Sequence, residues 1–393
     1  MISRFMQSRM APSPIREAYE RAERLKTEYG ASEVFDFSIG NPTAPCPQGV
    51  AQALSATLES SGPAIHGYMQ DCGYLEVRQA VADSLNRRFG SSFGPEHIVM
   101  TAGAACALNV LMRAVIDPGD ELVVFAPYYA AYRTFADNWG IKLVTVPYDE
   151  RTMFPNLDAF EAALTPATRM VLVNTPHNPT GLVYPDDVAE GIVDVLKRRK
   201  QETGQDILLV SDEPYRELAF DGTKAPWWPA LYENTVVVYS WSKSASIAGE
   251  RIGYAALPPT MEGVDELCHC IRRGIGELGF VNASATAQRM AMACVDQTVD
   301  VSYYDVNRKA LYEGLLDCGF SPIKGNGAFY LLLPAPDGDE ERFLENLAAH
   351  RIVAVGGSAF ECPGYVRLSY CISNTAIKAS LPRFAEVARL YFG

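Results

Sequence analysis

Short apolar runs recur between residues 97 and 257, and most of them are apolar at every position rather than at alternate ones. Strands with two apolar faces are typical of parallel sheets that helices cover on both sides. Helical patterns such as 187–199 separate several runs, so the sequence predicts an α/β domain with a mostly parallel, seven-stranded sheet sandwiched by helices. The runs are Ile98–Thr101, Leu122–Ala126, Leu143–Val146, Met170–Asn174, Ile207–Ser211, Val236–Ser240 and Tyr254–Leu257.

The pattern changes after about residue 290. A long helical stretch is predicted over Ala291–Cys318, and strand-like runs follow at 328–333, 352–355 and 366–372, before a closing helix near 381–390. This order of elements indicates a smaller α+β unit.

The N-terminal part carries a clear helix signal. Ser13 is placed to cap a helix that starts with Pro14, and Gly30 is placed to end it. We therefore expect three parts: an N-terminal segment, 1–46, that belongs to the small domain; a large domain, 47–290; and a C-terminal small domain, 291–393.

Composition narrows the possible partners. The 34 Lys and Arg residues against 47 Asp and Glu give a net charge of −13, and Lys and Arg form no long run, which argues against nucleic acid and anionic membranes. No apolar stretch approaches the roughly 18 residues of a membrane helix, and the first ten residues lack the apolar core of a signal peptide. The nine scattered cysteines indicate neither a disulfide framework nor a metal site. We expect a cytoplasmic protein.

Polar residues follow the ends of the predicted strands, where open parallel sheets bind ligands. The first run leads into Gly103-Ala104-Ala105 at the start of a helix, where small residues let an anion approach backbone N–H groups, although close helix packing also favours them. The fourth run leads into a turn rich in proline and glycine that contains Asn178.

Charged and polar residues follow the next two runs. Asp212 and Tyr215 follow the fifth run, whereas Ser240, Ser242 and Lys243 follow the sixth, with Arg251 eight residues further on. A carboxylate or an amine at the end of a buried strand is costly unless it is paired or chemically used. Together these groups suit a phosphorylated pyridine aldehyde that serves as an electron sink.

The motifs Asn178-Pro-Thr-Gly181 and Ser240-x-Ser-Lys243-x7-Arg251 resemble those of the class I/II pyridoxal-5′-phosphate (PLP) aminotransferases, which are fold-type-I, aspartate aminotransferase-like enzymes. The resemblance covers about residues 35–372. It implies the cofactor PLP and the transfer of an amino group between an L-amino acid and a 2-oxo acid, with aspartate and 2-oxoglutarate as one pair to test.

The resemblance also implies residue roles. Lys243 matches the lysine that binds the cofactor covalently and moves the substrate proton, and Asp212 matches the acid that pairs with the pyridinium nitrogen. Tyr215 and Asn178 match the groups that hydrogen-bond the ring's phenolic oxygen, and Tyr129 matches the aromatic residue that stacks on the ring. The phosphate ligands implied are Gly103, Ala104, Ala105, Ser240, Ser242 and Arg251.

Three further positions match substrate and subunit contacts. Arg367 matches the arginine that forks onto the substrate α-carboxylate, and Gly40 and Asn178 match contacts beside it. Tyr68 matches a tyrosine that reaches the phosphate of the neighbouring subunit, which implies a homodimer with shared sites.

Two alternatives use the same fold. A β-eliminating C–S lyase of the cystathionine type would share every cofactor residue. A PLP-binding regulator would carry a DNA-binding module before the match, and the roughly 34 preceding residues are too few for one. The sequence leaves the side-chain specificity open. Ala105 stands where dicarboxylate-specific relatives place a lysine, and neither Arg272 nor Arg273, near Glu277, can be assigned as the arginine that such relatives contribute across the dimer.

Overall fold

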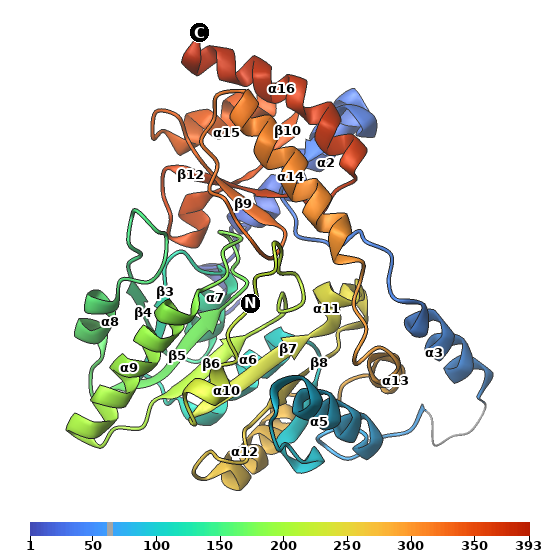
Figure 1. The fold of residues 1–393 in the computed structure, drawn as a ribbon, viewed down its shortest axis with the longest axis vertical. Helices are drawn as coiled ribbons and strands as arrows, with labels where there is room; N and C mark the ends of the chain where they lie inside the picture. The colour runs from blue at the N-terminus through green and yellow to red at the C-terminus, as the bar shows by residue number, and fades with distance from the viewer. Residues whose placement is uncertain (61–65) are drawn as a thin grey trace.

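The computed structural model describes residues 1–60 and 66–393. Figure 1 shows the seven-stranded sheet with its helices in the lower half of the view, and the smaller sheets with the C-terminal helices in the upper half. The order of the large sheet is β2-β8-β7-β6-β5-β3-β4, and β8 runs antiparallel to both neighbours while the other pairs are parallel. Its strands are β2 (Ile98–Thr101), β3 (Glu121–Phe125), β4 (Lys142–Val146), β5 (Thr168–Asn174), β6 (Leu208–Asp212), β7 (Thr235–Ser240) and β8 (Gly253–Ala256).

The predicted fold class is confirmed, and β3 shows why the runs are apolar throughout. Leu122 and Val124 pack into a core with helices α6 and α12, whereas Val123 and Phe125 pack into the core on the other face, with α8 and α9. Successive side chains of a strand point to opposite faces, so both faces here exclude water. The helices around this sheet are α5 (Leu75–Phe89), α6 (Ala104–Val115), α7 (Ala131–Asn138), α8 (Leu157–Ala163), α9 (Asp186–Thr203), α10 (Trp228–Leu231), α11 (Trp241–Ser244), α12 (Val264–Glu277) and α13 (Ala285–Ala293).

The N-terminal segment joins the C-terminal elements. Strand β1 (Phe35–Asp36) pairs in parallel with β10 (Ile352–Val353), while β11 (Val355–Gly356), β12 (Tyr365–Ser369) and β9 (Tyr330–Pro334) form an antiparallel sheet. The first long helix begins and ends as predicted, since Ser13 accepts a hydrogen bond from the amide of Arg16 and Gly30 ends the helix at a φ of 90°. The helices here are α2 (Pro14–Tyr29), α14 (Val301–Asp317), α15 (Glu340–Ala349) and α16 (Asn374–Phe392). Helix α1 (Arg4–Gln7) precedes Arg9, which pairs with Asp137 of α7, and α3 (Gln48–Glu59) packs against α13.

The prediction of one helix over Ala291–Cys318 is wrong, because α13 and α14 are separate helices. Between them the chain turns to bond the carbonyl of Ser244, which accepts hydrogen bonds from the Thr298 hydroxyl at 2.8 Å and the Val299 amide at 2.7 Å. Asp300 then caps α14 by accepting from the amide of Ser302. These tertiary bonds override a local pattern that favours a continuous helix.

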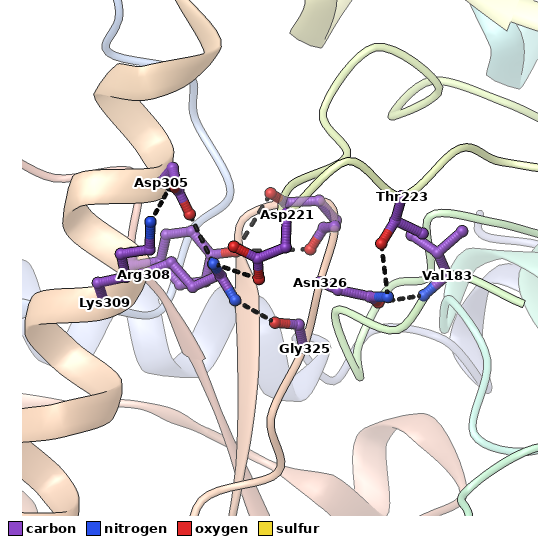
Figure 2. A network of polar contacts seen from close by, with 11 residues as sticks. Val183, Asp221, Thr223, Asp305, Arg308, Lys309, Gly325 and Asn326 are labelled. Atoms are coloured by element: carbon purple, nitrogen blue, oxygen red, sulfur yellow. Dashed lines mark hydrogen bonds and ion pairs between the residues drawn. The ribbon is translucent and has the colours of Figure 1, made fainter.

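A buried arginine ties α14 to two loops. Figure 2 shows Arg308 of α14 donating to Asp221, to Asp305 and to the carbonyl of Gly325. The side chain of Asn326 accepts from the amide of Val183 at 2.8 Å and donates to Thr223 at 3.3 Å. The network fixes the start of the segment that leads into β9.

The described helices include none whose length and apolar content would let it cross a membrane. No cluster of three or more His, Cys, Asp or Glu side chains that could hold a metal ion occurs within residues 1–60 and 66–393. All nine cysteines are free thiols.

Candidate active site

A cavity of about 300 Å³ lies at the carboxyl ends of β5, β6 and β7, and residues from the N-terminal segment, β9 and β12 close it from the other side. It brings together residues from Ile15 to Arg367, which are 352 positions apart in the sequence. Twelve of the fourteen predicted site residues line it: Gly40, Ala104, Ala105, Tyr129, Asn178, Asp212, Tyr215, Ser240, Ser242, Lys243, Arg251 and Arg367.

Asp212 occupies the last position of β6 and is 4% exposed. Its Oδ2 accepts a hydrogen bond of 2.6 Å from the Tyr132 hydroxyl, whereas its Oδ1 is buried without a partner. Burial raises the pKa of Asp212 to about 7, against the Tyr132 hydrogen bond and with the help of the Glu213 charge. Buried polar atoms normally have partners, so this oxygen indicates that a donor is missing from the cavity.

Lys243 lies in α11, directly after β7. Its Nζ donates a hydrogen bond of 2.6 Å to the carbonyl of Gly40. Burial lowers the pKa of the amine to about 8, and Arg251 and Arg367 also lower it while Cys371 acts in the opposite direction. The neutral, nucleophilic fraction of this amine near physiological pH is therefore larger than that of an exposed lysine.

One end of the cavity is suited to an anion. The first turn of α6, at Ala104 and Ala105, borders it, and the Ser240 and Ser242 hydroxyls lie 2.7 Å apart beside it. The Arg251 guanidinium donates to the carbonyls of Ala248 and Ala102. Helix N-termini and arginine favour phosphate groups.

Gly103, which does not line the cavity, shapes this end as the cap of α6. Its φ is 81°, and a Cβ there would lie 2.6 Å from Nη2 of Arg251. The positive φ therefore favours glycine at this position. Gly40 is constrained by space alone, because a Cβ would lie 1.9 Å from the Tyr330 hydroxyl.

Arg367, in β12, is 2% exposed and lies between Tyr330 and Phe360, whose ring centroids are each 4.5 Å from Cζ. It donates to Oδ1 of Asn178 at 3.0 Å and to the carbonyl of Ser38 at 2.8 Å, and its Nε is buried without a partner. None of the ion pairs found among the described residues includes it. A buried guanidinium with a free donor is suited to an external carboxylate.

Aromatic residues complete the cavity wall. The Tyr215 hydroxyl lies 2.9 Å from that of Tyr330, and burial raises the pKa of Tyr215 well above its ordinary value, so it stays a phenol at neutral pH. Tyr129 lines the cavity edge-on to Tyr132, with centroids 5.6 Å apart. Tyr68 lies outside the cavity and is 96% exposed.

Sequence reasoning missed several contributors. Tyr132 holds Asp212, Tyr330 holds Tyr215, and Asn174 donates to the carbonyl of Asp212 at 2.7 Å while its Oδ1 accepts from the amide of Asn178 at 2.9 Å. Tyr132 comes one helical turn after Tyr129, which is a weak signal. Tyr330 had no local signal, because its contact with Tyr215 spans 115 residues.

The fold and the cavity define a PLP enzyme of fold type I. Residues 32–383 match the family model of aminotransferase class I and II. The chain belongs to this family, and it is a PLP-dependent transaminase.

Named relatives agree with this assignment. An amino transferase from Eubacterium rectale has a structure that superposes with a TM-score of 0.97 at 37% identity, over 100% of both chains. The aspartate/prephenate aminotransferase of Thermus thermophilus is 31% identical, over 93% of this chain and 94% of its own length. The structure of aspartate aminotransferase from T. thermophilus with maleate has a TM-score of 0.87 at 29% identity, over 98% of this chain and 99% of that one.

The residues present fit PLP. The unpartnered Oδ1 of Asp212 suits a protonated ring nitrogen, and the anionic end with Arg251 suits a phosphate. The amine of Lys243, whose pKa burial lowers to about 8, lies in the same cavity.

Proposed function

We propose that this cavity holds PLP and transfers an amino group between an L-amino acid and a 2-oxo acid, with Lys243, Asp212 and Tyr215 as the catalytic residues. The observation that carries the proposal is the buried, unpartnered Oδ1 of Asp212 in the cavity that Lys243 lines. Bound PLP supplies a ring that withdraws electrons from the substrate α-carbon.

The chain's own groups perform the remaining tasks. The Lys243 amine, in its neutral form, takes the proton from the α-carbon and then returns it, a role suited to a pKa near the working pH. Burial alone disfavours the charge of Asp212, but a cationic ring nitrogen beside it would stabilise the carboxylate, which in turn would hold the proton on that nitrogen. Tyr215 and Asn178 donate hydrogen bonds to the ring's phenolic oxygen, and Tyr129 stacks on the ring.

Binding is assigned to the two ends of the cavity. The phosphate is held by the Ser240 and Ser242 hydroxyls, by Arg251 and by the backbone at the start of α6, which are Gly103, Ala104 and Ala105. The α-carboxylate is held by the fork of Arg367, with Asn178 and the backbone of Gly40 beside it. The free Nε of Arg367 supports this assignment.

We assign residues 1–46 and 291–393 to one small domain and residues 47–290 to the large domain, since β1 pairs with β10. We also propose a homodimer in which Tyr68 reaches the partner's phosphate. The 96% exposure of Tyr68 in the single chain supports this role. Aspartate with 2-oxoglutarate is the first substrate pair to test, because the Thermus relative is named for aspartate.

The test is a panel of amino donors with 2-oxoglutarate and pyruvate as acceptors. Transamination yields the amino acid of the acceptor, whereas a β-eliminating lyase releases ammonia and pyruvate from the donor. Both products should be counted separately. Ammonia in excess over the new amino acid would contradict the proposed function.

Lys243→Ala should reduce amino transfer to the background rate, because no other amine lines the described cavity. The variant should still bind PLP, but borohydride should no longer fix the cofactor to the protein. Mass spectrometry of the reduced protein measures this. Cofactor fixed to another lysine of the variant would contradict the role of Lys243.

A further inference from the structure

The strip Ser38-Ile39-Gly40 links the two groups that define the substrate's position. The carbonyl of Ser38 accepts from Arg367 at 2.8 Å, and the carbonyl of Gly40 accepts from Lys243 at 2.6 Å. Ile39 lies between these two contacts, and its half-buried side chain lines the cavity. An α-amino acid with its carboxylate at Arg367 and its α-proton within reach of Lys243 therefore has Ile39 beside its α-carbon.

Ile15 of helix α2 adds a second apolar side chain to the cavity wall that Ile39 forms. It is the second residue of α2 and lines the cavity together with Ile39. Ile15, Ile39 and Gly40 also line an outer pocket of about 650 Å³. The two isoleucines thus separate the inner cavity from the outer pocket, where a substrate side chain leaves the α-carbon.

The cations of the inner cavity are already assigned. Those among its described lining residues are Lys243, Arg251 and Arg367. Arg251 belongs to the anion end, Lys243 serves proton transfer at the α-carbon, and Arg367 holds the α-carboxylate. A second substrate carboxylate would therefore have no cation of its own in this part of the protomer.

The cations of the outer pocket have partners of their own. Arg16 pairs with Glu20 at 2.9 Å. Lys26 pairs with Glu23 at 2.8 Å and with Asp36 at 3.0 Å. A distal carboxylate would have to compete with these acids or remain unpaired against Ile15 and Ile39, and an unpaired charge on an apolar wall is costly.

We propose that the amino donors of this enzyme carry apolar side chains, aliphatic or aromatic, and that Ile15 and Ile39 select them. The inference rests on the proposed function. It assigns a donor class different from the one in the name of the Thermus relative. Each methylene that leaves water against this wall favours the larger apolar donor.

The experiment compares kcat/KM of the holoenzyme for leucine, phenylalanine, aspartate and alanine with one common acceptor. Alanine has the shared carboxylate and amine but almost no side chain, so it serves as the reference donor. We expect leucine or phenylalanine to exceed alanine at least about 10-fold and aspartate to fall at least about 10-fold below alanine. If none of the four donors reacts, alanine included, the proposed function fails. If alanine reacts but kcat/KM for aspartate exceeds that for leucine, only this inference fails.

Ile39→Arg should raise the aspartate-to-alanine ratio at least about 10-fold and lower the leucine-to-alanine ratio, because it places a cation beside the side-chain path. These ratios cancel any general loss of activity, and the absorbance of bound PLP reports folding. Val306→Arg is the matched control, since Val306 lies on α14 and is 53% exposed. Unchanged ratios in Ile39→Arg would overturn the role of Ile39. If the enzyme prefers aspartate and Arg16→Gln abolishes that preference, the distal carboxylate binds in the outer pocket and the proposal is overturned.

Discussion

Two buried arginines of this protein differ in whether all of their donor nitrogens have hydrogen-bond partners. Arg308 is 5% exposed, and each of its three guanidinium nitrogens donates to an acceptor: Asp305, the carbonyl of Gly325 and Asp221 (Figure 2). Arg367 is 2% exposed, but it reaches only the amide oxygen of Asn178 and the carbonyl of Ser38, and its Nε has no partner.

The difference indicates that Arg308 serves the stability of the fold, whereas Arg367 serves ligand binding. A buried charge with carboxylate partners is costly to remove, because its partners are then left unpaired, whereas a buried charge without such a partner is a cost to the folded chain that a ligand can relieve. Asp212 shows the same feature as Arg367, with one oxygen unpartnered and a pKa raised by burial. Missing partners therefore locate the ligand groups of this cavity: a carboxylate at Arg367 and a cation at Asp212.

Arg367→Ala should have the largest effect on this comparison. Removal of one partner of a buried charged pair costs about 2–5 kcal/mol, which corresponds to about 30- to 5000-fold in kcat/KM. The loss should be similar for an acidic and an apolar donor, because all donors share the α-carboxylate, while PLP binding persists. Arg367→Lys should recover only part of the activity, since lysine keeps the charge but not the fork.

The readout is kcat/KM for one acidic and one apolar donor in both variants. A loss confined to the acidic donor would mean that Arg367 binds a distal carboxylate instead. No loss with either donor would remove Arg367 from the substrate site.

Asp212→Asn should keep the fold, because the amide is nearly isosteric and can still accept from Tyr132. The rate should fall at least ~100-fold, about 2.7 kcal/mol of barrier, since a neutral amide cannot hold the ring nitrogen protonated by charge. Single-turnover rates with saturating PLP measure the effect. A rate near that of the wild type would reduce Asp212 to a structural role.

The same substitution should change the pH dependence of apo-protein stability. The folded-state pKa of Asp212 is raised to about 7 from 3.8, so the folded chain binds more protons than the unfolded chain between pH 4 and 7. The contribution of Asp212 to stability therefore falls as pH rises through this window. Apo Asp212→Asn should gain stability relative to the wild type from pH 4 to pH 7, as measured by denaturant unfolding.

The fold of the large sheet could be predicted because its strands are continuous apolar runs bounded by turn residues. Each predicted strand lies within two residues of an observed one. The break between α13 and α14 could not be predicted in this way, because it depends on bonds to Ser244, more than 50 positions away. The run 352–355 is likewise divided between β10 and β11 by pairing with β1 and β12.

The candidate site shows a similar limit. Residues that follow strand ends, such as Asp212 and Lys243, could be predicted from their position after a buried run. Their orienting partners could not, because Tyr330 reaches Tyr215 only through the tertiary fold. The Arg308 network had no signal at all, since an arginine in an amphipathic helix is ordinarily exposed.

Arg308→Met should have the smallest effect of the substitutions predicted for this comparison, and it tests the structural role of Arg308 through the unfolding free energy. It removes the link of α14 to Asp221 and to the carbonyl of Gly325, so the apo protein should lose about 2 kcal/mol of unfolding free energy. The cost should stay below that of a fully buried pair, because the Asp221 side chain is 46% exposed and water can solvate it. Arg367→Met should destabilise the apo protein less, since Arg367 lacks a carboxylate partner.

Guanidinium unfolding of the apo proteins at one concentration compares the two methionine variants directly. Arg16→Met is the control for an exposed ion pair, with a side chain 62% exposed, and should change stability by less than about 0.5 kcal/mol. Equal destabilisation by Arg308→Met and Arg367→Met would show that the hydrogen bonds to Asn178 and Ser38 suffice to satisfy Arg367. The missing partner at Nε would then no longer mark a ligand position, and the carboxylate would have to be located by the kinetic test alone.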